Sequence, residues 1–391
     1  MFILPDIVRD NFSGSAEITG SQAEGHYWLF PSEIKQAILG QDVANVRAAK
    51  EKHADDLKAT LDLLKTKQKN AFKTVTNPSR KQGYQLCETD TGIMWTYPVN
   101  VQNADKKYKV TVAVGSFSKN ANIIGISTTV FGWIPAQIAA AVVSSVAAEA
   151  VATFVAQRLA GVAFPAALAF VEALVASVLE AVGIAVWSPS SLSASWSSTL
   201  YPSLKKKFGL EVNIHNWSTM EEWVVTEWFG DNADIQDAKS ATEPFQKVEL
   251  PRITGKIVMP DGTNTASSDL ITSYAAYTVI NHNTWLEGVG IGLKVVSKAE
   301  PSQGKLMHSI YLKYVIHWRA DNELNIGYTA NSLSDFYEDE WAKAGTMSMQ
   351  IEVPSKGGHP AIPVVALTPS LGGETSHMYT LDVHIGASAS K

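Results

Sequence analysis

The chain has 391 residues, a formal net charge of −6 and a single cysteine, Cys87. This length predicts two or three domains. The slightly acidic balance gives no indication of nucleic-acid binding, and a single cysteine excludes both a disulfide framework and a cysteine-based zinc site.

The N-terminus does not have the pattern of an export signal. Asp6, Arg9 and Asp10 place charges too early for the apolar core of a secretory signal peptide. We therefore expect a soluble cytosolic protein without a cleavable signal peptide. If it acts outside the cell, it would be released by lysis or by an unconventional route.

A long amphipathic helix is the first predicted element. Ser32 is a suitable N-cap with Glu33 in the first turn, and apolar residues recur every three to four positions as far as about Thr74. Gly40 predicts a break in this helix. The positions opposite the apolar stripe are charged, which indicates a solvent-facing surface: Lys50, Glu51, Lys52, Asp55, Asp56 and Lys58.

Residues 84–117 change to a period of two. Apolar residues at alternate positions separate polar or small ones, which is typical of half-buried β-strands. We predict one β-hairpin here, with alternating positions Ile93, Trp95, Tyr97, Tyr108, Val110, Val112 and Val114.

The stretch from Ala121 to Trp187 is almost free of charge. Pro135 suits the first turn of a helix, where its missing N–H has no cost. Gly161 and Pro165 bracket a short break between two helical runs. At 1.5 Å per residue, each run exceeds the ~30 Å hydrocarbon thickness of a bilayer. We therefore predict an apolar helical hairpin over 121–187.

Small residues recur at every fourth position in both predicted helices. Fourfold spacing places them along one ridge, which allows two helix backbones to approach closely in a membrane. The ridges consist of Ala136, Ala140, Ser144, Ala148, Ala152, Ala156 and Ala160 in the first run, and Ala169, Ala173, Ser177, Ala181 and Ala185 in the second.

A thin polar edge lies beside each ridge. Ionisable groups inside membranes usually face a water-filled cavity, so the polar residues here are candidates for lining a pore. They are Glu149, Thr153 and Gln157 in the first run, and Glu172 and Glu180 in the second. The connecting turn around Phe164 carries no charge, so its tip is predicted to enter lipid.

A serine-rich linker after Trp187 predicts a domain boundary. From Leu210 onwards alternation dominates, with strands predicted at 210–217, 248–259, 271–280, 285–296, 308–318, 324–328, 347–353, 362–367 and 378–385. Residues 221–229 are ambiguous and also fit a short helix. This number of short strands predicts an antiparallel β-sandwich.

Catalytic and cofactor motifs are not found in the sequence. Gly288, Gly290 and Gly292 form a string of alternate glycines, but no helix pattern follows them. We therefore expect them to allow close packing or strand curvature and not to bind phosphate. His377, Asp382 and His384 are the best metal candidates, although scattered strand histidines are usually structural. We expect no enzyme, no cofactor and no metal site.

Aromatic residues are numerous in the C-terminal half. Most are expected to lie in the core, and exposed ones would suit sugar rings or the lipid head-group region. They include Trp217, Trp223, Trp228, Trp285, Trp318, Trp341, Tyr274, Tyr277, Tyr311 and Tyr314.

The predicted fold is α+β. A helical membrane-active domain over 1–190 contains the β-hairpin 84–117 and the helical hairpin 121–187. An antiparallel β-sandwich for surface recognition follows over 191–391. At the level of organisation this resembles the helical pore-forming toxins. That resemblance rests on the character of Ala121–Trp187, and it implies a hydrophobic hairpin that stays hidden until it meets a membrane.

The functional hypothesis is a water-soluble, pore-forming protein acting at a target cell membrane. Its expected partners are target membrane lipid and further copies of itself, and a glycan receptor, a protein receptor or a partner chain stays open. Nucleic acid is not an expected partner. Two alternatives also stay open: a non-enzymatic, lectin-like binding or scaffold protein whose apolar helices are buried core, and a resident membrane protein with two spans.

Overall fold

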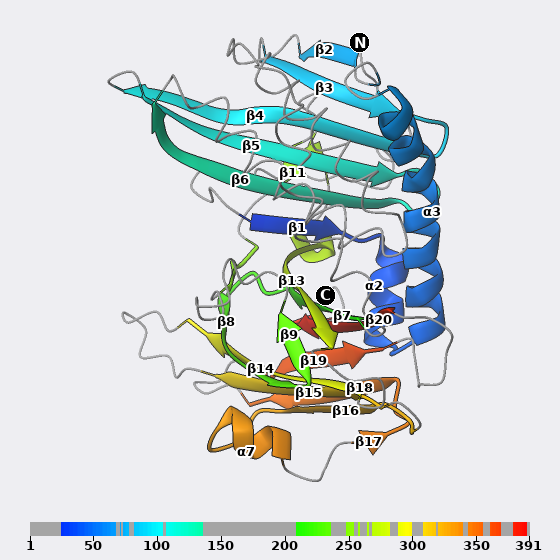
Figure 1. The fold of residues 1–391 in the computed structure, drawn as a ribbon, viewed down its shortest axis with the longest axis vertical. Helices are drawn as coiled ribbons and strands as arrows, with labels where there is room; N and C mark the ends of the chain where they lie inside the picture. The colour runs from blue at the N-terminus through cyan, green and yellow to red at the C-terminus, as the bar shows by residue number, and fades with distance from the viewer. Residues whose placement is uncertain are drawn as a thin grey trace. The chain divides into compact units, whose positions relative to one another are not determined.

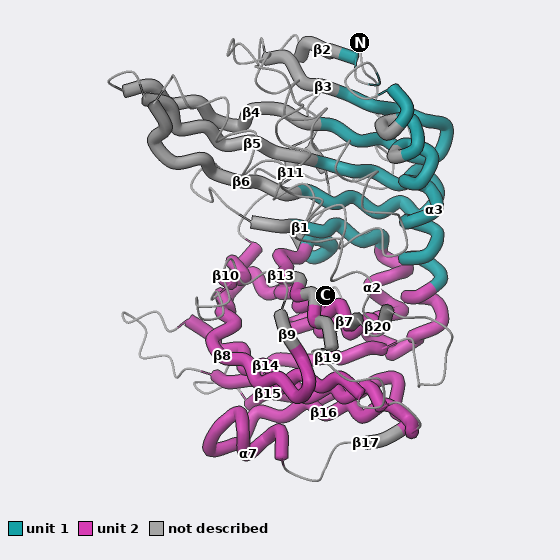
Figure 2. Tube along the Cα trace, viewed as in Figure 1, with its two compact units in different colours: residues 1–31, 48–202, 254–271 teal, residues 32–47, 203–253, 272–391 magenta. Residues whose placement is uncertain are grey.

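The structure is a computed structural model of the chain. It describes residues 25–67, 71, 73–77, 82–104, 107–135, 209–235, 248–253, 257–258, 264–265, 268–281, 288–298, 308–317, 320–338, 343–354, 360–368 and 378–388. The chain divides into two compact units that are interleaved in sequence (Figure 2). Unit 1 takes Met1–Pro31, Ala48–Pro202 and Thr254–Ile271, and unit 2 takes Ser32–Arg47, Ser203–Ile253 and Thr272–Lys391.

Two consecutive helices, α2 (Ser32–Leu39) and α3 (Val43–Lys67), replace the single long helix expected from the sequence. The break near Gly40 is confirmed. Gln41 has a positive φ of 55°, and Asp42 starts α3 by accepting a hydrogen bond from the Asn45 backbone N over 3.1 Å. The predicted end near Thr74 is wrong, because α3 ends at Lys67 and a strand follows at Lys73–Asn77.

Unit 1 contains an antiparallel sheet with neighbouring strands in the order β1-β6-β5-β4-β3-β2 (Figure 1). Their bounds are β1 (Gly25–Leu29), β6 (Ile123–Pro135), β5 (Lys107–Ser118), β4 (Gly92–Ala104), β3 (Gln82–Glu88) and β2 (Lys73–Asn77). A short pair, β11 (Ile257–Val258) with β12 (Asn264–Thr265), and the 3-10 turn η4 (Ser268–Leu270) also belong to this unit.

The sheet of unit 1 is buried on both faces near the start of β4. Ile93, Met94 and Trp95 follow one another along the strand and are each no more than 2% exposed. Trp95 lies directly opposite Gly115 of β5 in the strand register. A Cβ atom on Gly115 would lie only 2.0 Å from Cε2 of the Trp95 ring, so glycine is needed there for the ring to cross the neighbouring strand.

Unit 2 contains two groups of paired strands. The first has the order β18-β19-β20-β7-β13, with β9 also paired to β13. Its strands are β18 (Ser348–Val353), β19 (Ile362–Leu367), β20 (Met378–Ile385), β7 (Gly209–Asn216), β13 (Ile271–Asn281) and β9 (Ala233–Ile235). The β20–β7 pair is parallel and the other pairs are antiparallel.

The second group has the order β10-β8-β14-β15-β16-β17 and is antiparallel. It consists of β10 (Val248–Leu250), β8 (Trp223–Asp231), β14 (Val289–Ser297), β15 (Ser309–Ile316), β16 (Glu323–Gly327) and β17 (Lys343–Ala344). One buried hydrophobic core takes side chains from both groups, including Val212, Leu381, Trp223, Leu293 and Leu312.

A short helix, α7 (Leu333–Glu338), packs against the glycine string on β14. A Cβ atom on Gly290 would lie 1.9 Å from Oη of Tyr337, and one on Gly292 would lie 3.1 Å from Cδ2 of the same residue. The expectation of close packing is therefore confirmed, and Gly290 and Gly292 admit this helix. Gly288 lies instead against the Ile316 carbonyl, where a Cβ atom would be 1.8 Å from the oxygen.

The expected fold, a helical N-terminal domain followed by a β-sandwich, is wrong. Strands predominate over helices among the described residues, and residues 73–135 contribute a sheet. The error has a physical cause. The predicted apolar stretch began at Ala121, but residues 123–135 are rich in β-branched and aromatic side chains, and these favour a strand. In the C-terminal half, the β20–β7 pair departs from the expected antiparallel pattern.

Candidate functional site

One carboxylate on α3 accepts hydrogen bonds from the β5–β6 turn of unit 1. Asp56 is only 4% exposed. The backbone N of Asn120 donates to it over 2.9 Å, the side-chain Nδ2 of Asn120 over 2.6 Å, and the backbone N of Ala121 over 3.1 Å. Ser118 Oγ donates a further hydrogen bond. We call Asp56 with Ser118, Asn120 and Ala121 the Asp56 network.

The turn itself is shaped to present these donors. Asn122 closes it with a hydrogen bond of 2.9 Å from its backbone N to the Ser118 carbonyl. Its φ of 57° lies in the left-handed region, which asparagine tolerates better than most residues. The consecutive backbone N–H groups of Asn120 and Ala121 both point at the Asp56 carboxylate and donate to it, as in an anion-binding turn.

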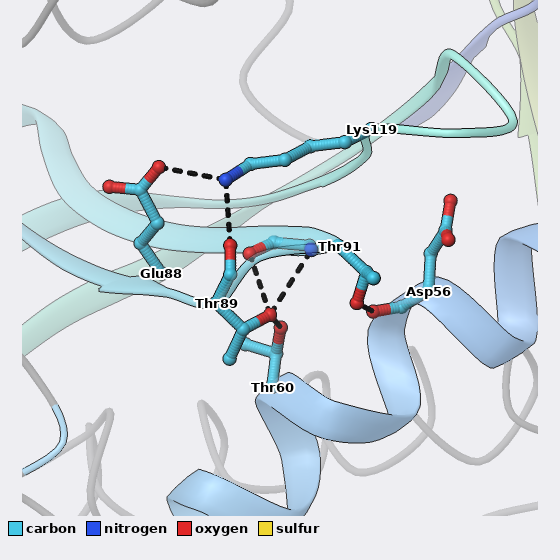
Figure 3. A network of polar contacts seen from close by, with 7 residues as sticks. Asp56, Thr60, Glu88, Thr89, Thr91 and Lys119 are labelled. Atoms are coloured by element: carbon cyan, nitrogen blue, oxygen red, sulfur yellow. Dashed lines mark hydrogen bonds and ion pairs between the residues drawn. The ribbon is translucent and has the colours of Figure 1, made fainter.

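The β3–β4 turn contacts the same part of α3 (Figure 3). Thr91 Oγ1 donates to the Asp56 carbonyl over 2.7 Å, and the Thr60 and Thr89 hydroxyls lie 2.9 Å apart. Thr89 Oγ1 also accepts from the Gly92 backbone N over 3.1 Å. A Cβ on Gly92 would lie 2.8 Å from the Asp56 carbonyl oxygen, so only glycine lets the strand approach the helix this closely.

Lys119 joins the two turns. Its Nζ donates to the Thr89 carbonyl over 2.6 Å and to Glu88 Oε1 over 2.9 Å (Figure 3). Glu88 is substantially exposed, so this ion pair contributes little to stability. The Asp56 network is the stronger part of the arrangement because its carboxylate is buried.

The electrostatics of Asp56 are dominated by two opposing effects. Burial alone would raise the pKa of this carboxyl group. The hydrogen bonds from Ser118, from the side chain and backbone of Asn120, and from the Ala121 backbone outweigh burial, and the pKa lies below its ordinary value of 3.8. Asp56 is therefore a charged anchor at neutral pH. Since donors occupy both of its oxygens, it is poorly suited to act as a general base.

The Asp56 network fixes one end of β6. This strand starts at Ile123, directly after the turn, and runs away from α3 (Figure 1). β1 pairs only with Ile124–Thr128 of β6, whereas β5 follows β6 along most of its length. The Asp56 network therefore ties the start of β6 to α3.

Pro135 is the one predicted insertion residue that the structure describes. It is the last residue of β6 and does not lie in the first turn of a helix as expected. The other predicted packing and pore-lining residues lie outside the described residues: Ala136, Ala140, Ser144, Ala148, Glu149, Ala152, Thr153, Ala156, Gln157, Ala160, Gly161, Phe164, Pro165, Ala169, Glu172, Ala173, Ser177, Glu180, Ala181 and Ala185.

Two of the three metal candidates are described, and His377 lies outside the described residues. Asp382 and His384 are both buried on β20. Asp382 accepts a hydrogen bond from Asn213 Nδ2 over 3.2 Å, and His384 Nδ1 accepts one from Trp217 Nε1 over 3.2 Å. In the described part of the chain no group of three or more His, Cys, Asp or Glu side chains is arranged to hold a metal ion.

The predicted aromatic residues of unit 2 are mostly core. Trp217, Trp223, Tyr274, Tyr277, Tyr311 and Tyr314 are buried, and Trp228 is partly buried against the core. Trp285, Trp318 and Trp341 lie outside the described residues. Among the side chains of unit 2 whose exposure the structure describes, Tyr328 is the only aromatic in the exposed class, at 40%.

Cys87 is buried on β3, and burial raises the pKa of its thiol to about 11. The reactive form of cysteine is the thiolate. At neutral pH this side chain is therefore a neutral thiol that behaves as a small apolar core residue.

Sequence reasoning missed the main role of Asp56, which was placed on the solvent-facing side of the helix. The structure buries it together with His53, Leu57 and Thr60. The spacing of polar residues on the helix could have indicated this burial. Asp56 lies three positions after His53 and four before Thr60, so the three side chains share one face of α3. The donors from the β5–β6 turn are more than 60 positions away in sequence, and a helical pattern carries no information about them.

None of the helices in the described ranges is long and apolar enough to cross a bilayer. Comparison of the chain with models of known protein families and with curated proteins gave no match.

Proposed function

We propose that this protein is a membrane-active, pore-forming protein that inserts the apolar segment 136–187 into a target membrane. The observation that carries the proposal is the composition of that segment. Its only charged residues are Glu149, Arg158, Glu172 and Glu180. Lipid accepts a polypeptide whose backbone satisfies its own hydrogen bonds, and two apolar helices joined by the uncharged turn at Phe164 meet that condition.

The fourfold ridges support assembly of several copies. Small residues such as Ala148 and Ala173 allow helices to approach closely. The adjacent polar edge, with Glu149, Thr153 and Gln157, would then face a water-filled lumen. Target lipid and further copies of the chain are the partners of this proposal.

In this proposal the Asp56 network holds the strand to which the inserting segment is attached. It holds the start of β6 to α3 through a charged, fully hydrogen-bonded carboxylate. The segment 136–187 is joined to the opposite end of that strand, at Pro135. In this proposal, the anchored strand keeps the segment attached to unit 1 while the segment itself enters the bilayer.

Vesicle leakage tests the proposal directly. Purified full-length protein is expected to release dye from vesicles that contain anionic lipid. A variant in which residues 136–187 are replaced by a short Gly/Ser linker is expected to give background leakage, because the apolar segment is missing. Circular dichroism and the unfolding transition of the variant serve as the control for folding.

The outcomes separate the alternatives. If the full-length protein retains all dye at neutral and acidic pH, membrane activity is rejected and a binding or scaffold protein is favoured. If the protein can be extracted only with detergent, a resident membrane protein is favoured. Equal leakage by the linker variant would show that the segment 136–187 is not the active element.

A substitution on the ridge tests assembly separately from binding. Ala148→Leu is expected to lower leakage about tenfold with little change in vesicle binding, because a larger side chain separates packed helices. Chemical cross-linking on vesicles should show fewer oligomers. Ala147→Leu is the matched control, since it makes the same change off the ridge. Equal loss of binding and leakage in Ala148→Leu would contradict the ridge hypothesis.

A further inference from the structure

Unit 2 contains a buried row of polar side chains on the face of β7 and β20 that points away from its hydrophobic core. The parallel register places Asp382 opposite Asn213 and His384 opposite His215. The residues between them along the strands, such as Ile214 and Val383, belong to the core. This polar face is not solvated, because both histidines are only 1% exposed.

The two histidine rings stack on each other. Their centroids lie 4.6 Å apart, and the planes are inclined by 14°. His215 also stacks on Tyr274 at 5.7 Å, and its Nδ1 lies 3.2 Å from Thr272 Oγ1. Two imidazolium ions in this contact would repel each other at short range without intervening water. The packing therefore disfavours a state in which both rings are charged.

The hydrogen bond from Trp217 assigns the protonation state of His384. The indole Nε1 is a donor only, and it lies 3.2 Å from His384 Nδ1. His384 Nδ1 must therefore be the acceptor, so the neutral ring carries its proton on Nε2. Protonation at Nδ1 would place two N–H donors face to face and break this bond.

Charged groups on three described elements of unit 2, α2, β7 and β20, lie on or next to this polar face. Lys35 of α2 is 3% exposed, and its Nζ lies 5.7 Å from the centroid of the Trp217 ring. Glu211 and Asp382 lie on the polar face, and Asn213 Nδ2 donates to both of them, over 2.7 Å and 3.2 Å. The carboxylates favour one imidazolium, but they do not restore the Trp217 bond or remove the repulsion within a doubly charged pair.

We propose that the His215–His384 pair is a pH-sensitive switch for unit 2. In the state that the structure shows, His384 accepts from Trp217 at an unprotonated Nδ1, and Lys35 of α2 lies over the Trp217 ring. Mild acid protonates the pair, breaks the Trp217–His384 bond and releases α2 from the polar face. This proposal concerns the folded protein in water and does not depend on membrane insertion.

The direction and size of the effect follow from proton linkage. The unfolded chain takes up protons on its histidines near the ordinary pKa of about 6.5. The folded unit 2 resists this uptake, so its stability is highest above that value and falls as pH decreases. For each pH unit below that value, one imidazole shifts the equilibrium between folded and opened unit 2 towards the opened state by up to about tenfold. The pair shifts it by up to about 100-fold.

Hydrogen exchange with mass spectrometry tests the switch. The wild-type chain is compared at about pH 7.5 and about pH 5.5, after correction for the intrinsic exchange rate. Peptides covering 32–39, 209–217 and 378–386 are expected to lose protection at least about tenfold at the lower pH. Peptides covering Asp56 and the β5–β6 turn should keep theirs, because Asp56 stays charged there.

Two variants sharpen the test. In His384→Asn, the amide oxygen supplies an acceptor for Trp217 but has no proton to gain, so most of the acid-induced loss of protection should disappear. His308→Asn removes a partly exposed histidine and should behave like the wild type. Should His384→Asn fail to fold, NMR of ring-labelled wild-type protein serves instead. Two of the nine histidines should stay neutral below about pH 6.5 until unit 2 opens.

Unchanged protection in the wild type at the lower pH would overturn the proposal. So would a His384→Asn variant that is as acid-sensitive as the wild type, or an NMR titration in which all histidines gain protons together near the ordinary value. None of these readouts involves lipid, so this proposal can fail while pore formation succeeds, and the reverse also holds.

Discussion

Asp56→Ala is expected to lower the free energy of unfolding of unit 1 by about 3–5 kcal/mol. The substitution removes a buried acceptor and leaves the donors of Ser118, Asn120 and Ala121 without the carboxylate that they share. Chemical denaturation should show the loss, and hydrogen exchange should locate it in α3, in the β5–β6 turn and at the start of β6.

Asp55→Ala is the matched control for this prediction. It makes the same change at the preceding helix position, where the side chain is exposed, and it should alter stability by less than about 0.5 kcal/mol. If the two variants unfold at the same denaturant concentration, the Asp56 network is not an anchor.

The pH dependence of the Asp56 contribution has a defined sign. The pKa of Asp56 is lower in the folded protein than its ordinary value of 3.8. The group therefore stabilises the fold fully above that value and loses its contribution as pH falls towards the lower, folded value. The stability difference between the wild type and Asp56→Ala should stay constant from neutral to mildly acidic pH and shrink only in strong acid.

Gly115→Ala is expected to destabilise unit 1 by about 3 kcal/mol through overpacking. The added methyl group would lie 2.0 Å from Cε2 and 2.1 Å from Cζ2 of Trp95. Because Trp95 is only 2% exposed, its ring cannot move aside into solvent. Denaturation followed by tryptophan fluorescence measures the cost.

A double substitution distinguishes overpacking from a general weakness of alanine in β5. Trp95→Leu alone creates space in the core and should also destabilise unit 1. In the double variant Gly115→Ala/Trp95→Leu, the methyl group has room, so the combined loss should be clearly smaller than the sum of the two single losses. Additive losses would show that the two residues do not interact.

Local patterns predicted the local elements of this fold well. The helix start at Ser32 and the break near Gly40 were readable from capping and glycine signals. Alternation located β7, β13, β19 and β20, whose buried residues occur at every second position on the core side. These features depend on neighbouring residues, which is the information that a single sequence contains.

Sequence patterns that fit both a helix and a strand were assigned incorrectly or left open. Residues 221–229 fitted both a helix and a strand, and the structure places β8 there because Trp223 and Val225 are buried in the core between its neighbours. The apolar character of 123–135 was assigned to the helical stretch, although its β-branched residues complete the sheet beside β5.

The candidate sites depend on pairings that no local pattern predicts. Asp56 meets Asn120 across 64 positions, and Trp217 meets His384 across 167. Each of these residues looks ordinary in its own segment: a charge on an amphipathic helix, a polar turn, or a strand histidine. Only the folded register gives them their role.

The parallel pairing of β20 with β7 also affects how unit 2 folds during synthesis on the ribosome. Asn213 and Asp382 lie side by side but are 169 positions apart, so β7 waits for most of unit 2 to be translated before this partner emerges. Until then, the apolar side that carries Val212 and Ile214 is incompletely covered. Nascent chains halted before β20 should therefore bind chaperones or precipitate. Non-local strand pairing is slow, and apolar surface and unpaired strand edges stay exposed until it is complete.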